Sequence, residues 1–238
     1  SRIMDYGNGS IDRRRVLALG GSLLGLAALG SAVWPAKSAA AASLVPSSLS
    51  PDEALKRLLD GNRRFTGHHL EHPDQSEERV LELTQAQHPF ATVLSCADSR
   101  VTAEIIFDQG LGDIFDVRVA GNIATPEVVG SIEYAVELLE TPLLMVLGHE
   151  RCGAVTAAVE NDPLPGQIGT FVDAILPAIA QVKGQPGDAV DNAVSANVRY
   201  QVDQLMRSPL VRDRQRSGQL QVVGARYDLD TGTVTLVT

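Results

Sequence analysis

From residue 90 onward, short and mainly apolar runs alternate with longer amphipathic stretches. Apolar runs of this length are typical of strands buried on both faces of a parallel sheet. Strands are predicted over 90–95, 114–119, 143–147, 220–227 and 233–237. Helices are predicted over 125–139, 170–183 and 189–206. The alternation predicts an α/β fold with a mostly parallel central sheet flanked by helices.

A helical arm is predicted in front of this sheet. Ser50 fits an N-cap, Pro51 fits the first helical position, and Glu53 completes a capping box. The helix then carries an apolar stripe of three leucines, Leu55, Leu58 and Leu59. A second helix is expected from residue 77 to about residue 87.

Three histidines lie between these two helices, His68, His69 and His72. Clustered histidines are candidate metal ligands. Here they lie in a polar stretch with Pro73, so we interpret the segment as a solvated loop.

The first 42 residues have the composition of a targeting segment. Three consecutive arginines at 13–15 precede an apolar run over 16–33, and small residues follow over 36–42. This order is typical of a twin-arginine signal peptide, which predicts an exported, periplasmic or extracytoplasmic protein. An uncleaved N-terminal membrane anchor is the alternative. Residues 43–50 are interpreted as a linker and 51–238 as one globular domain.

The charge balance excludes some partners. The 238 residues carry a formal net charge of −9, and the segment 1–42 holds five basic groups against two acidic ones. The predicted domain is therefore more acidic than the whole chain. An acidic domain argues against nucleic acid and against an anionic membrane surface as partners, since both require a basic face.

Both cysteines of the chain occur in motifs that directly follow predicted strands. Cys96 begins Cys96-Ala97-Asp98-Ser99-Arg100, and Cys152 ends His149-Glu150-Arg151-Cys152. Two thiolates and an imidazole are ligands that suit Zn²⁺. Open α/β sheets bind ligands beyond the carboxyl ends of their strands, which is where both motifs are expected. The alternative is two buried free thiols and a core histidine.

The motifs and their neighbours resemble the β-class carbonic anhydrases, from about residue 50 to the end of the chain. The blocks that carry the resemblance are Cys-Ala-Asp-Ser-Arg-Val at 96–101, Arg-Val-Ala-Gly-Asn at 118–122, Ser-Ile-Glu-Tyr-Ala-Val at 131–136, Gly-His-Glu-Arg-Cys-Gly-Ala at 148–154 and Val-Val-Gly-Ala-Arg-Tyr-Asp-Leu at 222–229. The resemblance implies reversible hydration of CO₂ to bicarbonate by hydroxide on one Zn²⁺ per chain. The implied protein ligands are Cys96, His149 and Cys152.

The resemblance also implies roles for residues around the metal. Asp98 pairs with Arg100 and orients the hydroxide in an open form, and it becomes the fourth zinc ligand in a closed form. The implied substrate pocket consists of Gln87, Phe115, Tyr134 and Gly153, partly contributed across a subunit interface. The expected assembly is a homodimer or a higher homo-oligomer. The N-terminal helix then lies across the partner subunit or, alternatively, packs on its own domain.

One departure from the family concerns regulation. Members with a regulatory bicarbonate site carry a tryptophan three residues before the first cysteine ligand, where this chain has Val93. This favours the open form.

Two other functions are compatible with the same framework. One is a CS₂ or COS hydrolase, and the other is a catalytically silent zinc-binding protein. Asp98, Arg100 and Gln87 are all present, which argues against the silent protein.

Overall fold

The strands form one five-stranded sheet in this computed structural model, which describes residues 49–237. The sheet has the order β2-β1-β3-β4-β5, with β5 antiparallel to β4 and every other pair parallel. The strands are β1 (Ala91–Ser95), β2 (Ile114–Arg118), β3 (Leu143–His149), β4 (Gln221–Tyr227) and β5 (Val234–Val237). The predicted α/β fold with a mostly parallel sheet is therefore confirmed.

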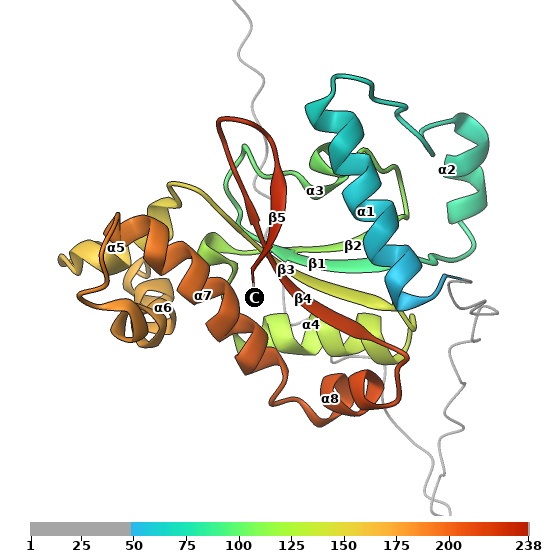
Figure 1. The fold of residues 1–238 in the computed structure, drawn as a ribbon. Coiled ribbons are helices and arrows are strands. Elements are labelled where there is room, and N and C mark those ends of the chain that lie inside the picture. Colours follow the sequence, from blue (N-terminus) through green and yellow to red (C-terminus); the bar gives the residue numbers. More distant parts are fainter. Residues whose placement is uncertain (1–48, 238) are drawn as a thin grey trace, which may run out of the picture. The chain divides into compact units, whose positions relative to one another are not determined.

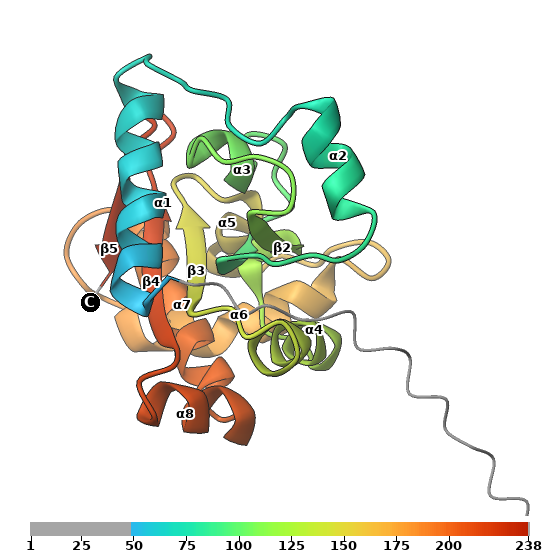
Figure 2. The ribbon, with the colours of Figure 1, turned by 90° about the vertical axis from the view of Figure 1, so that its right-hand side faces the viewer.

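Helices cover both faces of the sheet (Figures 1 and 2). One face is covered by α1 (Pro51–Thr66) and α3 (Ala103–Ile106). The helix α2 (Glu77–Leu83) has no buried residue and lies at the periphery, where Arg79 donates to the Leu111 carbonyl. The other face is covered by α4 (Pro126–Glu137), α7 (Ala189–Leu205) and α8 (Pro209–Arg216). The helices α5 (Gly153–Glu160) and α6 (Gly169–Val182) pack with α7 and the short turn η1 (Ala120–Asn122). This last group forms an apolar cluster that contains both cysteines.

Every residue of β1 and β3 is buried, because each face of these two strands packs against helices. Val93 and Met145 belong to the cluster under α1 and α3. Leu94 and Val146 belong to the cluster under α4, α7 and α8. A shift of one residue in pairing would exchange these two sets of side chains, so burial on both faces specifies the register.

The first helix packs on its own sheet. Ser50 and Glu53 form the predicted capping box, with the Ser50 amide donating to the Glu53 carboxylate at 2.8 Å. Leu58 is fully buried in the cluster that includes β1 and β3. The buried Asn62 side chain donates to the Gly232 carbonyl at 2.8 Å and accepts from the Val234 amide at 2.9 Å. The helix therefore packs on its own domain, which is one of the two arrangements expected for it.

The second helix is shorter than predicted. It ends at Leu83 and not near residue 87, and the Thr84 hydroxyl donates to the Leu81 carbonyl at its end. Pro89 disfavours helical geometry at residue 88, so the chain runs without a helix from residue 86 to the start of β1. Gln87 therefore lies in an exposed loop.

Three short helices were not predicted, namely α3, α5 and α8. Each has eight residues or fewer, which is too short for a clear amphipathic period. The start of α8 did carry a local signal, since Ser208 is its N-cap and Pro209 its first residue.

Two sequence predictions concern segments away from the sheet. His68, His69 and His72 are exposed in the loop between α1 and α2, as predicted. The predicted signal segment, 1–42, and most of the linker lie outside the described residues. Within 49–237, no helix has the length and apolar character needed to cross a bilayer.

Truncating Leu58 should measure how strongly α1 is held. Leu58→Ala removes a fully buried side chain and should lower the free energy of unfolding by about 2–5 kcal/mol. Leu59→Ala is the matched control, because Leu59 is only half-buried and lies outside the core cluster. Chemical denaturation at several protein concentrations measures both. A loss for Leu58→Ala that changed with concentration would instead indicate packing across a partner subunit.

Candidate metal centre

Two cysteines and one histidine meet at the carboxyl ends of β1 and β3. Cys96 directly follows β1, His149 is the last residue of β3, and Cys152 is the N-cap of α5. All three are buried, and their ligand atoms lie within 4.8 Å of one another. The two sulfurs are 3.9 Å apart and both thiols are free. Two thiolates bound to one tetrahedral zinc at about 2.3 Å would lie about 3.8 Å apart, so the observed spacing fits a shared metal.

The orientation of the His149 ring also fits a metal. Its Nδ1 atom lies 2.9 Å from the Glu150 carbonyl oxygen, which can only accept, so Nδ1 carries the proton. The lone pair is therefore on Nε2, which is buried and has no hydrogen-bond partner. Buried nitrogen atoms are rarely left without a partner. A backbone contact that fixes the tautomer in this way is typical of a metal-binding histidine.

The two sulfurs form a hydrogen bond whose proton either of them can carry. This contact holds the pKa of the Cys96 thiol well below its usual range, with help from His149 and the Gly121 amide. The same contact, together with burial, raises the pKa of Cys152. A divalent cation would replace that proton and hold both sulfurs as thiolates.

The turn from His149 to Cys152 is tied to the end of β4. The Glu150 amide donates to the Tyr227 carbonyl at 2.9 Å. The Arg151 guanidinium donates to both carboxylate oxygens of Asp230, at 3.0 and 2.7 Å. These contacts hold the two middle residues of the turn, so the distance between the His149 ring and the Cys152 sulfur depends on β4 as well as on β3.

A carboxylate lies beside the three candidate ligands. Asp98 receives two hydrogen bonds from the Arg100 side chain, at 2.9 and 2.7 Å, and one from its amide at 3.0 Å. These bonds hold the pKa of Asp98 well below its usual range, so the group is ionised at neutral pH. Its Oδ2 atom lies 3.8 Å from Nε2 of His149. Arg118 braces this segment by donating to the Cys96 and Asp98 carbonyls, at 3.2 and 2.7 Å.

Three predicted pocket residues, Gln87, Phe115 and Tyr134, lie far from the cysteines of the same subunit. Phe115 and Tyr134 contact each other, with ring centroids 6.1 Å apart, and Phe115 pairs with Thr92 near the start of β1. Gln87 precedes β1, whereas Cys96 follows it. The five residues of β1 alone span roughly 16 Å at about 3.3 Å per residue. Within one subunit, Gln87 therefore cannot reach the cysteines.

Gly153 is the one predicted pocket residue that lies close to the ligands. It is the first residue of α5, directly after Cys152. A Cβ atom added there would meet no atom of the chain within 4 Å, so no close approach within the subunit requires a glycine. The space beside it is open.

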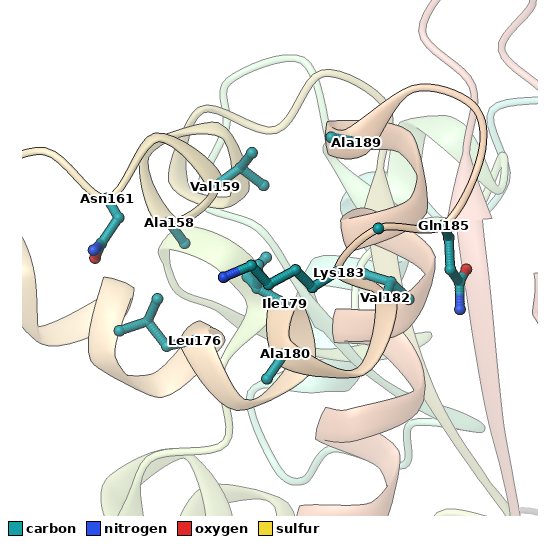
Figure 3. A pocket seen from close by; sticks show the side chains of 11 residues that line it. Ala158, Val159, Asn161, Leu176, Ile179, Ala180, Val182, Lys183, Gln185 and Ala189 are labelled. Carbon is teal, nitrogen blue, oxygen red and sulfur yellow. The ribbon is translucent and has the colours of Figure 1, made fainter.

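A separate apolar cavity of about 380 Å³ lies between α5, α6 and the start of α7 (Figure 3). Its walls include Leu176, Ile179 and Val182, with the Lys183 side chain extending across it. No residue of the Cys96, His149 and Cys152 group lines this cavity. The chemistry-bearing residues are thus outside it.

Comparison with known proteins agrees with this geometry. The family model described as carbonic anhydrase matches residues 91–234, which is more than half of the chain. The chain belongs to the β-class carbonic anhydrases. "Carbonic anhydrase 2" of Mycobacterium tuberculosis is 43% identical over 192 residues, covering 79% of this chain and 93% of the relative. "Carbonic anhydrase" of Mycolicibacterium smegmatis is 44% identical over the same length and with the same coverage.

Solved structures support the same class. The Coccomyxa β-carbonic anhydrase in complex with acetazolamide is 28% identical, with a TM-score of 0.62, and the match covers 77% of this chain and 86% of that one. The β-carbonic anhydrase CcaA is 26% identical with a TM-score of 0.63, and the match covers 76% and 86% of the two chains. The chain is therefore an enzyme with carbonic anhydrase activity, and family and fold support CO₂ hydration as its reaction.

This carbonic anhydrase has a further acidic group that the sequence pattern did not single out. Asp116 lies on β2, with its Oδ1 atom 3.5 Å from the Ser95 hydroxyl. Burial, with a smaller effect from Glu104, raises the pKa of Asp116 to about 6. The nearby Arg118 acts in the opposite direction. The sequence pattern gives no sign that this group is buried, because Asp116 and Arg118 alternate with apolar residues as they would on a strand with one solvent-exposed face.

The raised pKa of Asp116 predicts a pH-dependent gain in stability for Asp116→Asn. The folded enzyme favours the protonated carboxyl, so the wild type loses stability as the pH rises from about 4 to about 6. The amide cannot ionise, so the variant should match the wild type at pH 4 and exceed it at pH 7. Denaturation across this range measures the difference, with Asp203→Asn on the exposed side of α7 as control. An advantage that shrank with rising pH would mean that Arg118 stabilises the charged form.

Proposed function

We propose that Cys96, His149 and Cys152 hold one zinc ion per chain, at which the enzyme interconverts CO₂ and bicarbonate. The observation that carries this proposal is a buried group of two sulfurs 3.9 Å apart and an imidazole Nε2 atom without another partner. When bound, zinc lowers the pKa of a water ligand to about 7 and supplies a hydroxide nucleophile near neutral pH. Three protein ligands leave the fourth position for this chemistry.

Asp98 is assigned the role of orienting the nucleophile. Its carboxylate is ionised and lies 3.8 Å from Nε2 of His149, so it could accept a hydrogen bond from the oxygen that attacks CO₂. Such a bond would orient that oxygen toward CO₂. Arg100 fixes the carboxylate through its planar guanidinium, which donates to both oxygens of Asp98.

The same pair supports the open form of the site. To become a fourth metal ligand, Asp98 would have to give up hydrogen bonds to Arg100. Val93, fully buried on β1, stands where relatives with a regulatory bicarbonate site have tryptophan. Binding of Asp98 to the metal would therefore cost its hydrogen bonds to Arg100. The chain also lacks the tryptophan that accompanies the regulatory site.

Substituting Asp98 should separate chemistry from metal binding. Asp98→Asn keeps the size of the side chain but loses the charge that pairs with Arg100. We expect CO₂ hydration to fall by about 10²–10⁴-fold, the range typical of acid–base and orienting groups, with the zinc content unchanged. Stopped-flow hydration assays and metal analysis of the same preparations measure the two quantities.

The matched control is Cys152→Ser, which should lose most of the zinc together with the activity. Asp98→Asn with wild-type activity would demote the pair with Arg100 to a structural ion pair. Full zinc retention in both Cys152→Ser and Cys96→Ser would refute the metal centre.

We further infer that the active enzyme is a homo-oligomer, at least a dimer, in which subunits complete each other's substrate pockets. Gln87, Phe115 and Tyr134 lie toward the amino ends of β1 and β2, away from the cysteines of their own subunit. Tyr134 is 45% exposed, and Leu138, one turn later at the C-cap of α4, is 52% exposed. The adjacent strand β2 is the last in the sheet order, so one of its edges has no strand partner among residues 49–237. An exposed apolar strip beside a free strand edge is suited to a second copy of the chain.

Mixing two inactive variants should test this sharing. Cys96→Ser lacks a metal ligand but keeps Gln87, and Gln87→Ala keeps the metal ligands. If Gln87 of the partner subunit serves each zinc site, co-assembled subunits should recover CO₂ hydration that neither variant shows alone. Co-expression with two different affinity tags isolates the mixed assembly. Mixed assemblies no more active than the Gln87→Ala enzyme alone would contradict the arrangement.

Finally, we propose that the enzyme is exported by the twin-arginine route, on the basis of residues 1–42. The segment joins to the described domain through the linker that ends at Ser50. An uncleaved segment would instead anchor the enzyme to a membrane.

Export is tested with a reporter fused after about residue 50. The reporter should leave the cytoplasm, and changing all three arginines at 13–15 to lysine should stop it. Cell fractionation measures where the reporter accumulates in both cases. Unchanged export of the lysine variant would indicate the general secretory route, and an uncleaved product in the membrane would indicate an anchor.

A further inference from the structure

The sulfur of Cys96 accepts a hydrogen bond from the backbone. The Gly121 amide, in the turn η1 that follows β2, lies 3.4 Å from Sγ of Cys96. Gly121 has a φ of +72°, and a Cβ atom there would come within 2.7 Å of Ile175 Cδ1. The positive φ favours glycine at this position. The direction of the N–H follows from the conformation of the turn.

Two buried amide side chains on α7 hold that turn. Asn197 and Gln201 are one helical turn apart and are only 1% and 2% exposed. Asn197 Nδ2 donates to the Gly121 carbonyl at 2.9 Å. Gln201 Oε1 accepts from the Ala124 amide at 2.9 Å. The two side chains therefore bond to both ends of the backbone segment 121–124.

The two amides also fix each other. Gln201 Nε2 donates to Asn197 Oδ1 at 2.9 Å and lies 3.4 Å from the Ala174 carbonyl on α6. Each side chain thus uses both its carbonyl oxygen and its amide nitrogen. Buried polar groups that satisfy one another in this way rigidify the segment they contact, whereas a partly satisfied network would be costly.

We propose that Asn197 and Gln201 are positioning residues for the metal centre, which aim the Gly121 N–H at the Cys96 sulfur. The inference rests on the zinc centre proposed above. An N–H bond to a thiolate withdraws charge from sulfur and restrains its position, and contacts of this kind tune metal affinity.

Asn197→Leu tests the proposal, because leucine has the same branched shape as asparagine, removes the bond to Gly121 and introduces no new polar group. We expect zinc to be released to a chelator about 10–100-fold faster than from the wild type. In the cobalt-substituted enzyme, the sulfur-to-metal charge-transfer band should move to lower energy, because the Cys96 sulfur loses an N–H bond. Gln201→Met, which keeps the Asn197 contact with Gly121, should show smaller changes in the same direction.

Asn62→Leu is the matched control. Asn62 is also a buried asparagine that bonds to loop backbone, at Gly232 and Val234, but it lies on α1 in the other apolar cluster. It should lower thermal stability and leave zinc release and the cobalt spectrum unchanged.

The outcomes separate this inference from the zinc centre itself. A wild-type enzyme without zinc would overturn the metal centre. If the wild type binds zinc and Asn197→Leu has the same rate of zinc release and the same cobalt spectrum as the wild type, only the positioning role is overturned. If Asn197→Leu does not fold, Gln201→Met decides, and wild-type values for that variant would overturn the inference.

Discussion

Parallel pairing of β1 with β3 is the constraint on which the site depends. Ser95 pairs with Leu147, so the two strands end side by side and Cys96 leaves the sheet where His149 does. Both strands are buried on both faces, which makes any other register costly. Formation of the sheet therefore brings Cys96 and His149 together. Cys152 joins them because it is the N-cap of α5, which begins soon after β3 ends. A shift of one residue in the pairing of β1 with β3 would move the two cysteines apart. It would also exchange the side chains that face the two apolar clusters.

The sequence was sufficient for the features that depend on local pattern. Apolar runs predicted all five strands, and the thiol and imidazole residues behind two of them predicted the cluster of Cys96, His149 and Cys152. The capping box at Ser50 and the exposed histidine loop followed from local residue chemistry. These predictions succeeded because each depends on a few neighbouring residues whose physical preference is strong.

Features that depend on distant contacts were not predictable in the same way. The early end of α2 reflects the Thr84 contact and Pro89, and the helices α3, α5 and α8 are too short to show a period. Asn197 and Gln201 are spaced as one face of a helix, but nothing in the sequence says that this face meets a turn almost eighty residues earlier. The raised pKa of Asp116 likewise comes from burial at the sheet, and burial of a single acidic residue has no local signature.

The spacing of the two sulfurs has a consequence for redox chemistry. At 3.9 Å they are already neighbours, and closing that gap to the roughly 2.05 Å of a disulfide needs a movement of about 1.9 Å. Described residues include no other cysteine, so these thiols have only each other as an internal partner. In an oxidising compartment, a metal at this point would act as a protecting group as well as a catalyst, since it occupies the electron pairs that oxidation would consume. Loss of the ion would then expose the enzyme to inactivation by a bond between its own ligands.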